Sequence, residues 1–169
     1  MSFIIDEMDE FSIVGFIKKI PLGLGNIMCP LFWNELNENY FSKLDDNSEI
    51  SKYIKEHNIG EFAVCIDEME KDHFKYLVGG LYKGEKVPEG MEIYTFKKSK
   101  WAKFKCNGPL PIALQMLNAY IFDIWFKNMD CYELSQNANI EWYSNGDITN
   151  KDYESGIWLP IKRKGAVKK

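Results

Sequence analysis

Glu141 is the acidic residue of this sequence whose neighbours best suit ligand binding. It lies in the segment Asn139-Ile140-Glu141-Trp142-Tyr143, which has the composition of a β-strand rich in aromatic residues. A carboxylate supplies negative charge, and adjacent indole and phenol rings supply apolar and π contact. This combination predicts a site for a cationic or aromatic small molecule.

The spacing around Glu141 predicts which side chains share a face of the strand. Side chains alternate in an extended strand, so Glu141 and Tyr143 point one way and Ile140 and Trp142 the other. If helices cover the face of Ile140 and Trp142, Glu141 faces the open side of the sheet. A carboxylate in a partly apolar concavity carries a desolvation cost that a cationic ligand offsets. An ordinary solvent-facing glutamate would show the same pattern, and a slip of one residue would exchange Glu141 for Trp142.

Other chemical signals in the sequence are weak. The segment Leu22-Gly23-Leu24-Gly25 lacks the third glycine and the following Lys-Ser/Thr of phosphate-binding loops. His57 and His73 have no second His or Cys at ligand spacing, so we expect no metal site and no cofactor. Cys65 lies at the centre of a predicted strand, where a cysteine is usually a small buried apolar residue.

Length and charge exclude several classes of protein. The 169 residues predict a single domain over residues 1–169, and a net charge of −4 argues against direct nucleic-acid binding. The longest apolar stretch, residues 110–126, is interrupted by Gln115, Asn118 and Asp123, which argues against a membrane span. Four cysteines without C-x-x-C spacing, and the lack of a secretory signal, predict a cytoplasmic protein with reduced thiols.

The same order of predicted elements, strand–helix–strand–strand, occurs twice. We expect modules at about residues 10–82 and 91–162, with strands near 10–20, 62–67, 74–82, 91–96, 100–105, 140–143 and 157–161. The predicted helices are 31–44, with Pro30 in its first turn, 48–57, capped by Ser48, and 110–127. Short links between strands predict antiparallel pairing, with helices on one face, in an α+β fold. The acidic start (Asp6, Glu7, Asp9 and Glu10) is interpreted as a solvated terminus.

Several segments together resemble the GyrI-like effector-binding domain. The end of the chain carries most of the resemblance, in Asn139 to Tyr143 and in Asp152-Tyr153-Glu154-Ser155-Gly156-Ile157-Trp158-Leu159-Pro160-Ile161. Similar pieces occur at Ile13-Val14-Gly15, at Tyr76-Leu77-Val78-Gly79 and at Trp101-Ala102-Lys103-Phe104. The resemblance covers nearly the whole chain, in the order that the family shows.

The resemblance implies two βαββ modules related by a pseudo-twofold axis, with a ligand groove between them. Similar domains form the sensor halves of AraC-type and MerR-type multidrug regulators of transcription, where a buried glutamate ringed by aromatic residues receives lipophilic cations. Glu141 best matches that acid, and the resemblance makes Tyr143, Trp101, Tyr76 and Trp33 the expected aromatic residues of the groove.

Two departures from the family pattern stand out. The family often carries a second acid just before its final strand, where this chain has Gly156; Glu154, two residues earlier, could replace it. The regulators also carry a DNA-binding helix-turn-helix, for which 169 residues leave no room, so we expect a stand-alone member.

Three functions follow as hypotheses. The first is a sensor or sequestering protein that binds a lipophilic or cationic aromatic small molecule. The second is a hydrolase of cyclopropane-bearing compounds, with Glu141 as general base and Tyr143 assisting. The third is a protein-interaction module similar to gyrase-inhibitory proteins, which would bind a protein partner.

Overall fold

The computed structural model describes residues 2–69 and 71–165. The chain divides into two compact units, which we call the 11–95 unit and the 96–165 unit; the latter also contains the residues through Glu10. No helix within the described residues is both long enough and apolar enough to cross a membrane.

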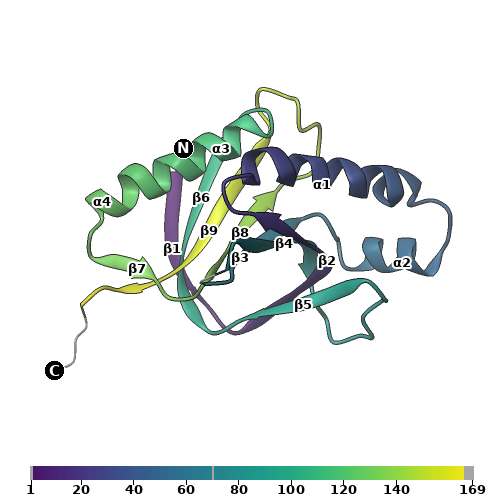
Figure 1. Cartoon of the computed structure of the whole chain (residues 1–169), viewed down its shortest axis with the longest axis horizontal. Coiled ribbons are helices and arrows are strands. Elements are labelled where there is room, and N and C mark those ends of the chain that lie inside the picture. Colours follow the sequence, from purple (N-terminus) through teal and green to yellow (C-terminus); the bar gives the residue numbers. More distant parts are fainter. Residues whose placement is uncertain (1, 70, 166–169) are drawn as a thin grey trace. The chain divides into compact units, whose positions relative to one another are not determined.

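The 11–95 unit is a four-stranded sheet with two α-helices. Its strands occur in the order β3-β4-β2-β5, and β4 is antiparallel to both β2 and β3. Helix α1 buries Phe32 and Leu36 and lies along the strands β2 and β4 in Figure 1. The elements are β2 (Phe11–Pro21), α1 (Gly25–Asn39), the short 3₁₀ helix η1 (Phe41–Lys43), α2 (Glu49–Glu56), β3 (Phe62–Asp67), β4 (His73–Leu81) and β5 (Met91–Phe96).

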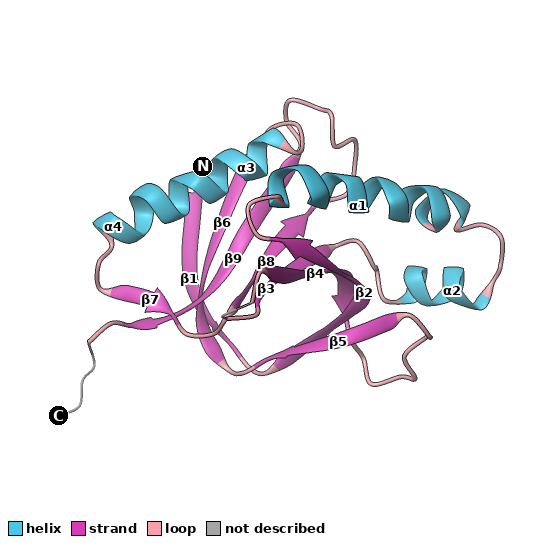
Figure 2. Ribbon diagram, viewed as in Figure 1, coloured by secondary structure: helices cyan, strands magenta, loops and turns pink. Residues whose placement is uncertain are grey.

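The 96–165 unit has the strand order β1-β6-β9-β8, with the short strand β7 also paired to β9. One continuous helical segment, residues 112–128, crosses these strands (Figure 2), and we call it the long helix. It contributes Leu114, Leu117, Ile121 and Trp125 to the core. The elements are β1 (Ser2–Met8), β6 (Ser99–Asn107), α3 (Ile112–Tyr120), the π-helical turn η2 (Ile121–Trp125), α4 (Phe126–Asn128), β7 (Tyr132–Leu134), β8 (Ala138–Tyr143) and β9 (Glu154–Arg163).

The two units have the same topology. In one, β2, α1, β3 and β4 form a βαββ module; in the other, β6, α3, β8 and β9 do. In each, the last strand pairs antiparallel with both the first and the second strand. The outer neighbour of the first strand is β5 in one unit and β1 in the other. The predicted α+β class, with antiparallel strands in two βαββ modules, is confirmed.

The first helix differs from the prediction at both ends. Helix α1 begins at Gly25 and ends at Asn39, so Pro30 lies inside it and not in its first turn. The amide groups of Ile27 and Met28 already donate to the carbonyl of Leu24, 3.1 and 2.8 Å away, which starts the helix before the proline. Proline costs one backbone hydrogen bond, which burial of Phe32 and Leu36 offsets. The predicted cap of α2 is confirmed, since Ser48 accepts from the amide of Ser51.

The acidic start of the chain forms an edge strand over residues 2–8 that the sequence pattern did not predict, although Glu7, Asp9 and Glu10 are exposed to solvent as expected. Strand β1 pairs with β6 in the register Phe3↔Phe104 and Ile5↔Ala102. The ring of Phe3 stacks on Phe104 at 5.3 Å and meets Trp125 edge-on at 5.5 Å. Alternation places Ile4 on the other face, where it is 60% exposed. The acidic residues obscured this alternation in the sequence.

Phe3→Ala should lower the free energy of unfolding by about 2 kcal/mol, because it removes the two aromatic contacts that this partly exposed ring makes with the core. Ile4→Ala is the matched control on the exposed face of the same strand and should change it by less than about 0.5 kcal/mol. Urea unfolding followed by circular dichroism measures both. Equal effects of the two substitutions would contradict the observed register.

Candidate functional site

Glu141 and Tyr143 lie side by side on β8. The Tyr143 hydroxyl donates a hydrogen bond of 2.6 Å to Oε1 of Glu141, and both residues are half-buried. A phenol that donates to a carboxylate forms a short, charge-assisted bond. The predicted sharing of one strand face by these two residues is therefore observed, and it fixes the orientation of the carboxylate.

Glu141 ends an otherwise apolar row that crosses the sheet. Residues paired directly across antiparallel strands point to the same face. The register pairs Phe3 with Phe104, Phe104 with Ile157, and Ile157 with Glu141. Phe104 and Ile157 are each 1% exposed. The carboxylate thus lies at the edge of a buried apolar row, where its charge loses part of its hydration.

This row lies on the face that the helix covers. Ile157 and Phe104 pack with Leu114, Leu117 and Ile121 of the long helix, and Tyr143 packs against the same cluster. Ile140 and Trp142 point to the opposite face. The sequence predicts that Glu141 faces the open side of the sheet if helices cover Ile140 and Trp142. In this unit the helix covers the other face, so that condition is not met. Glu141 is next to the helix-covered core.

The loop that follows Tyr143 is held by its own polar groups. Ser144 Oγ donates to the carbonyl of Glu154 at 2.6 Å, and Tyr153 Oη donates to the carbonyl of Ser144 at 2.6 Å. Tyr153 is 5% exposed, and its burial raises the pKa of the phenol above its usual value, although the contact with Ser144 lowers it. These bonds join β8 to β9 and keep Tyr143 opposite Ser155.

In the 11–95 unit, the other two predicted aromatic residues also meet. Trp33 Nε1 donates to the hydroxyl of Tyr76 at 2.9 Å, linking α1 to β4. Tyr76 is 1% exposed, and its ring meets Phe32 edge-on with centroids 6.4 Å apart. Each unit therefore has a tyrosine whose hydroxyl bonds another predicted site residue, Glu141 in one unit and Trp33 in the other.

Trp101 lies elsewhere. It is fully buried on β6, paired with Pro160, and its ring meets Phe96 edge-on at 5.0 Å. Alternation from Ala102, which belongs to the helix-covered core, places Trp101 on the opposite face from Glu141. Within the 96–165 unit, the structure brings Glu141 and Tyr143 together and separates Trp101 from them.

Gly156 explains the missing second acid. A Cβ atom built on Gly156 would lie 2.2 Å from the carbonyl oxygen of Phe104, so the strand has no space for a side chain there. Glu154 lies on the same face as Gly156, as its spacing predicts, and its carboxylate is 3.5 Å from Lys105 Nζ. That face is the opposite of the one that carries Glu141. Glu154 therefore does not add a second acid beside Glu141.

The same opposite face carries a shallow hollow of about 300 Å³ that sequence reasoning missed. Its side chains alternate with the core residues of β6, β8 and β9, and they include Lys103, Lys105, Trp142 and Trp158. Lys103 Nζ lies 4.3 Å from the centroid of Trp158 and 3.3 Å from the carboxylate of Asp6. Both lysines of the hollow thus have acidic partners.

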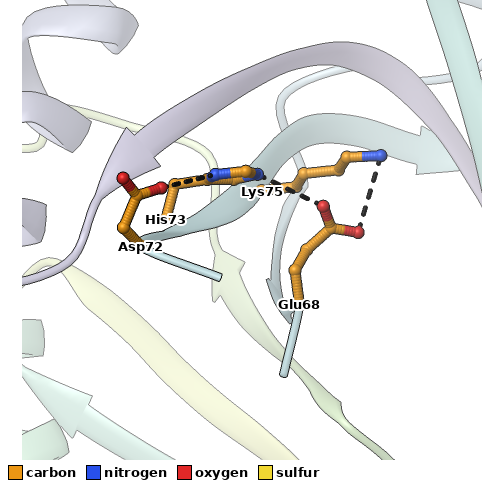
Figure 3. Close-up of polar contacts among 4 residues, drawn as sticks. All are labelled: Glu68, Asp72, His73 and Lys75. Atoms are coloured by element: carbon orange, nitrogen blue, oxygen red, sulfur yellow. Dashed lines mark hydrogen bonds and ion pairs between the residues drawn. The ribbon is translucent and has the colours of Figure 1, made fainter. Parts of the chain in front are cut away.

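A cluster of charged residues joins β3 to β4 in the 11–95 unit (Figure 3). The two carboxylate oxygens of Glu68 lie 3.3 Å from His73 Nε2 and 3.6 Å from Lys75 Nζ, and His73 Nδ1 is 3.4 Å from Asp72. Burial raises the pKa of Glu68, but the bond from His73 and the charges of Lys75 and Lys71 outweigh it, so the pKa is below its usual value. The carboxylate already contacts a lysine and a histidine of its own chain, as expected of a structural network.

The family model for integron-associated effector binding proteins matches residues 4–161. This chain belongs to that family. The match spans both βαββ modules, and the resemblance to GyrI-like effector-binding domains is confirmed. Among curated protein sequences, none matches this effector-binding protein.

Several solved structures share its fold. SAV2435 bound to tetraphenylphosphonium is 19% identical with a TM-score of 0.76, and the alignment covers 96% of this chain and 94% of that one. A putative bacterial transcription regulation protein from Staphylococcus aureus MU50 is 19% identical, with a TM-score of 0.68 and coverage of 96% and 99%. The C-terminal domain of EcmrR is 12% identical, with a TM-score of 0.61 and coverage of 96% and 98%.

Gly156→Ala should destabilise the effector-binding protein by about 1–3 kcal/mol, because its methyl group overlaps the carbonyl of Phe104. Glu154→Ala is the control: it removes only a half-exposed ion pair and should cost less than about 1 kcal/mol. Thermal unfolding by calorimetry compares the two. A Gly156→Ala protein as stable as the original would show that this strand tolerates a side chain.

Proposed function

We propose that this effector-binding protein binds lipophilic, cationic aromatic molecules on the helix-covered face of its 96–165 unit, with Glu141 as the acid. The observation that carries the proposal is the apolar row from Phe3 to Ile157 that ends at the Glu141 carboxylate. A lipophilic cation would extend the apolar contact and place its charge beside the acid.

Energetics favour a cation over a neutral ligand at this position. A carboxylate beside apolar side chains loses part of its hydration, and a cation recovers that cost while a neutral molecule does not. The Tyr143 hydroxyl already fixes Oε1, so the carboxylate needs little further ordering when a ligand binds. The ring of Tyr143 adds an aromatic surface that attracts cations.

The comparisons support the same ligand class. The family is one of effector binding proteins, and the structure of SAV2435 contains tetraphenylphosphonium, a lipophilic aromatic cation. We propose further that the protein senses or sequesters such a compound, as sensor domains of regulators do; the likeness to a putative transcription regulation protein favours this role.

Glu141→Gln tests the acid. Tetraphenylphosphonium is titrated by isothermal calorimetry into the original protein and the variant, with neutral triphenylphosphine oxide as the uncharged comparison. We expect the substitution to weaken cation binding about tenfold, equivalent to about 1.4 kcal/mol, and to leave the neutral compound unaffected.

Glu154→Gln is the matched control, because it removes an equal charge from the opposite face of the same sheet. It should leave cation affinity unchanged. If both substitutions weaken binding equally, the effect comes from net charge and not from a site at Glu141. If neither does, Glu141 is not the acid of the site.

A further inference from the structure

The C-terminal end of helix α2 holds a buried histidine whose second ring nitrogen faces carboxylates. His57 is 1% exposed, and its ring stacks on Tyr53 with centroids 3.9 Å apart. Its Nδ1 lies 3.1 Å from the backbone carbonyl of Tyr53. A carbonyl can only accept a hydrogen bond, so Nδ1 carries a proton. Nε2 is then the ring nitrogen that can contact another group.

The atom Nε2 points at acids without forming a hydrogen bond. It lies 2.7 Å from Oε1 of Glu85, but the two atoms are not aligned as donor and acceptor, and Nε2 has no hydrogen-bond partner among the described residues. Single ligand atoms of Glu56, His57 and Glu85 all lie within 4.8 Å of one another. Two lone pairs 2.7 Å apart repel each other, so this contact requires a positive centre between or beside the two atoms.

The structure assigns to Glu56, His57 and Glu85 a binding site for a divalent transition-metal ion of the Zn²⁺ type. Imidazole and carboxylate ligands together suit such ions. Four-coordinate zinc with bonds of about 2.0–2.2 Å holds its ligand atoms about 3.3 Å apart. Here Nε2 of His57 and Oε1 of Glu85 are 2.7 Å apart, and all three ligand atoms lie within 4.8 Å of one another. The exposed glutamates can make this adjustment while the buried histidine stays in place.

The surroundings orient the ligands as metal sites require. A histidine ligand commonly donates its other N–H to a carbonyl or carboxylate, which fixes the tautomer; the bond from Nδ1 to Tyr53 is of this kind. The Tyr82 hydroxyl donates to the carbonyl of Glu85 at 2.7 Å and folds the loop after β4 back toward α2. The C-terminal end of a helix also favours positive charge.

Two further features bring the ligands together. A Cβ atom on Gly80 would lie 1.9 Å from the carbonyl oxygen of His57, so β4 passes against the end of α2 only because residue 80 is glycine. Lys83 Nζ donates to the backbone carbonyl of Glu56 at 2.9 Å, which holds the loop after β4 against the end of α2. The three ligands would hold a cation that ties the loop after β4 to α2.

Zn²⁺ binding by the whole chain tests the assignment, with isothermal calorimetry and equilibrium dialysis against metal-free buffer. We expect one equivalent to bind, affinity to fall at least about tenfold in Glu85→Gln and in Glu56→Gln, and zinc to raise the melting temperature of the original protein more than that of these two variants. Both glutamates are exposed, so these variants should fold even if His57→Gln does not.

Controls separate this site from other ligands of the chain. Glu89→Gln changes an exposed acid in the same loop, His73→Gln changes the other histidine, and Cys131→Ser removes an exposed thiol. All three should bind zinc as the original does. The proposal is overturned if no zinc binds, or if binding persists in the doubly substituted Glu56→Gln, Glu85→Gln protein. It is also overturned if Glu85→Gln leaves zinc affinity unchanged and only lowers the stability of the protein in chelator-treated buffer. Loss of a simple ion pair between Glu85 and His57 would have that effect.

Discussion

The antiparallel register of β6, β9 and β8 is the constraint on which the account of the site depends. It aligns Phe104, Ile157 and Glu141 on the face that the long helix covers, and it sends Trp101, Trp158 and Trp142 to the other. A shift of one residue in β8 would exchange the acid for an indole. Gly156 protects the register, because its missing side chain lets β9 approach the carbonyl of Phe104.

A half-buried carboxylate on an apolar face is costly unless its charge is compensated. Here the Tyr143 hydroxyl gives a first compensation, and an incoming cation would give a second. Glu154, Glu68 and Asp6 each contact a lysine of their own chain, and none of the three lies on the apolar row. Position on the apolar row, and not acidity alone, is the reason for proposing Glu141 as the acid of a ligand site.

Alternation and turn chemistry predicted most of the fold. The strands at 62–67 and 91–96, the Ser48 cap and the shared face of Glu141 and Tyr143 follow from local pattern, and the structure has them. Which face the helix covers depends on long-range packing, which no local pattern encodes. The approach of Glu85 to His57 likewise depends on a tertiary contact at Gly80 between segments far apart in the chain.

The crystal structure of this protein with tetraphenylphosphonium tests the central claim most directly, because it locates the positive charge. We predict that the phosphonium lies beside the Glu141 carboxylate, on the face that carries Ile157 and Tyr143, with its phenyl rings on apolar side chains. A cation bound instead in the hollow of Trp142 and Trp158, on the opposite face of the sheet, would contradict the account.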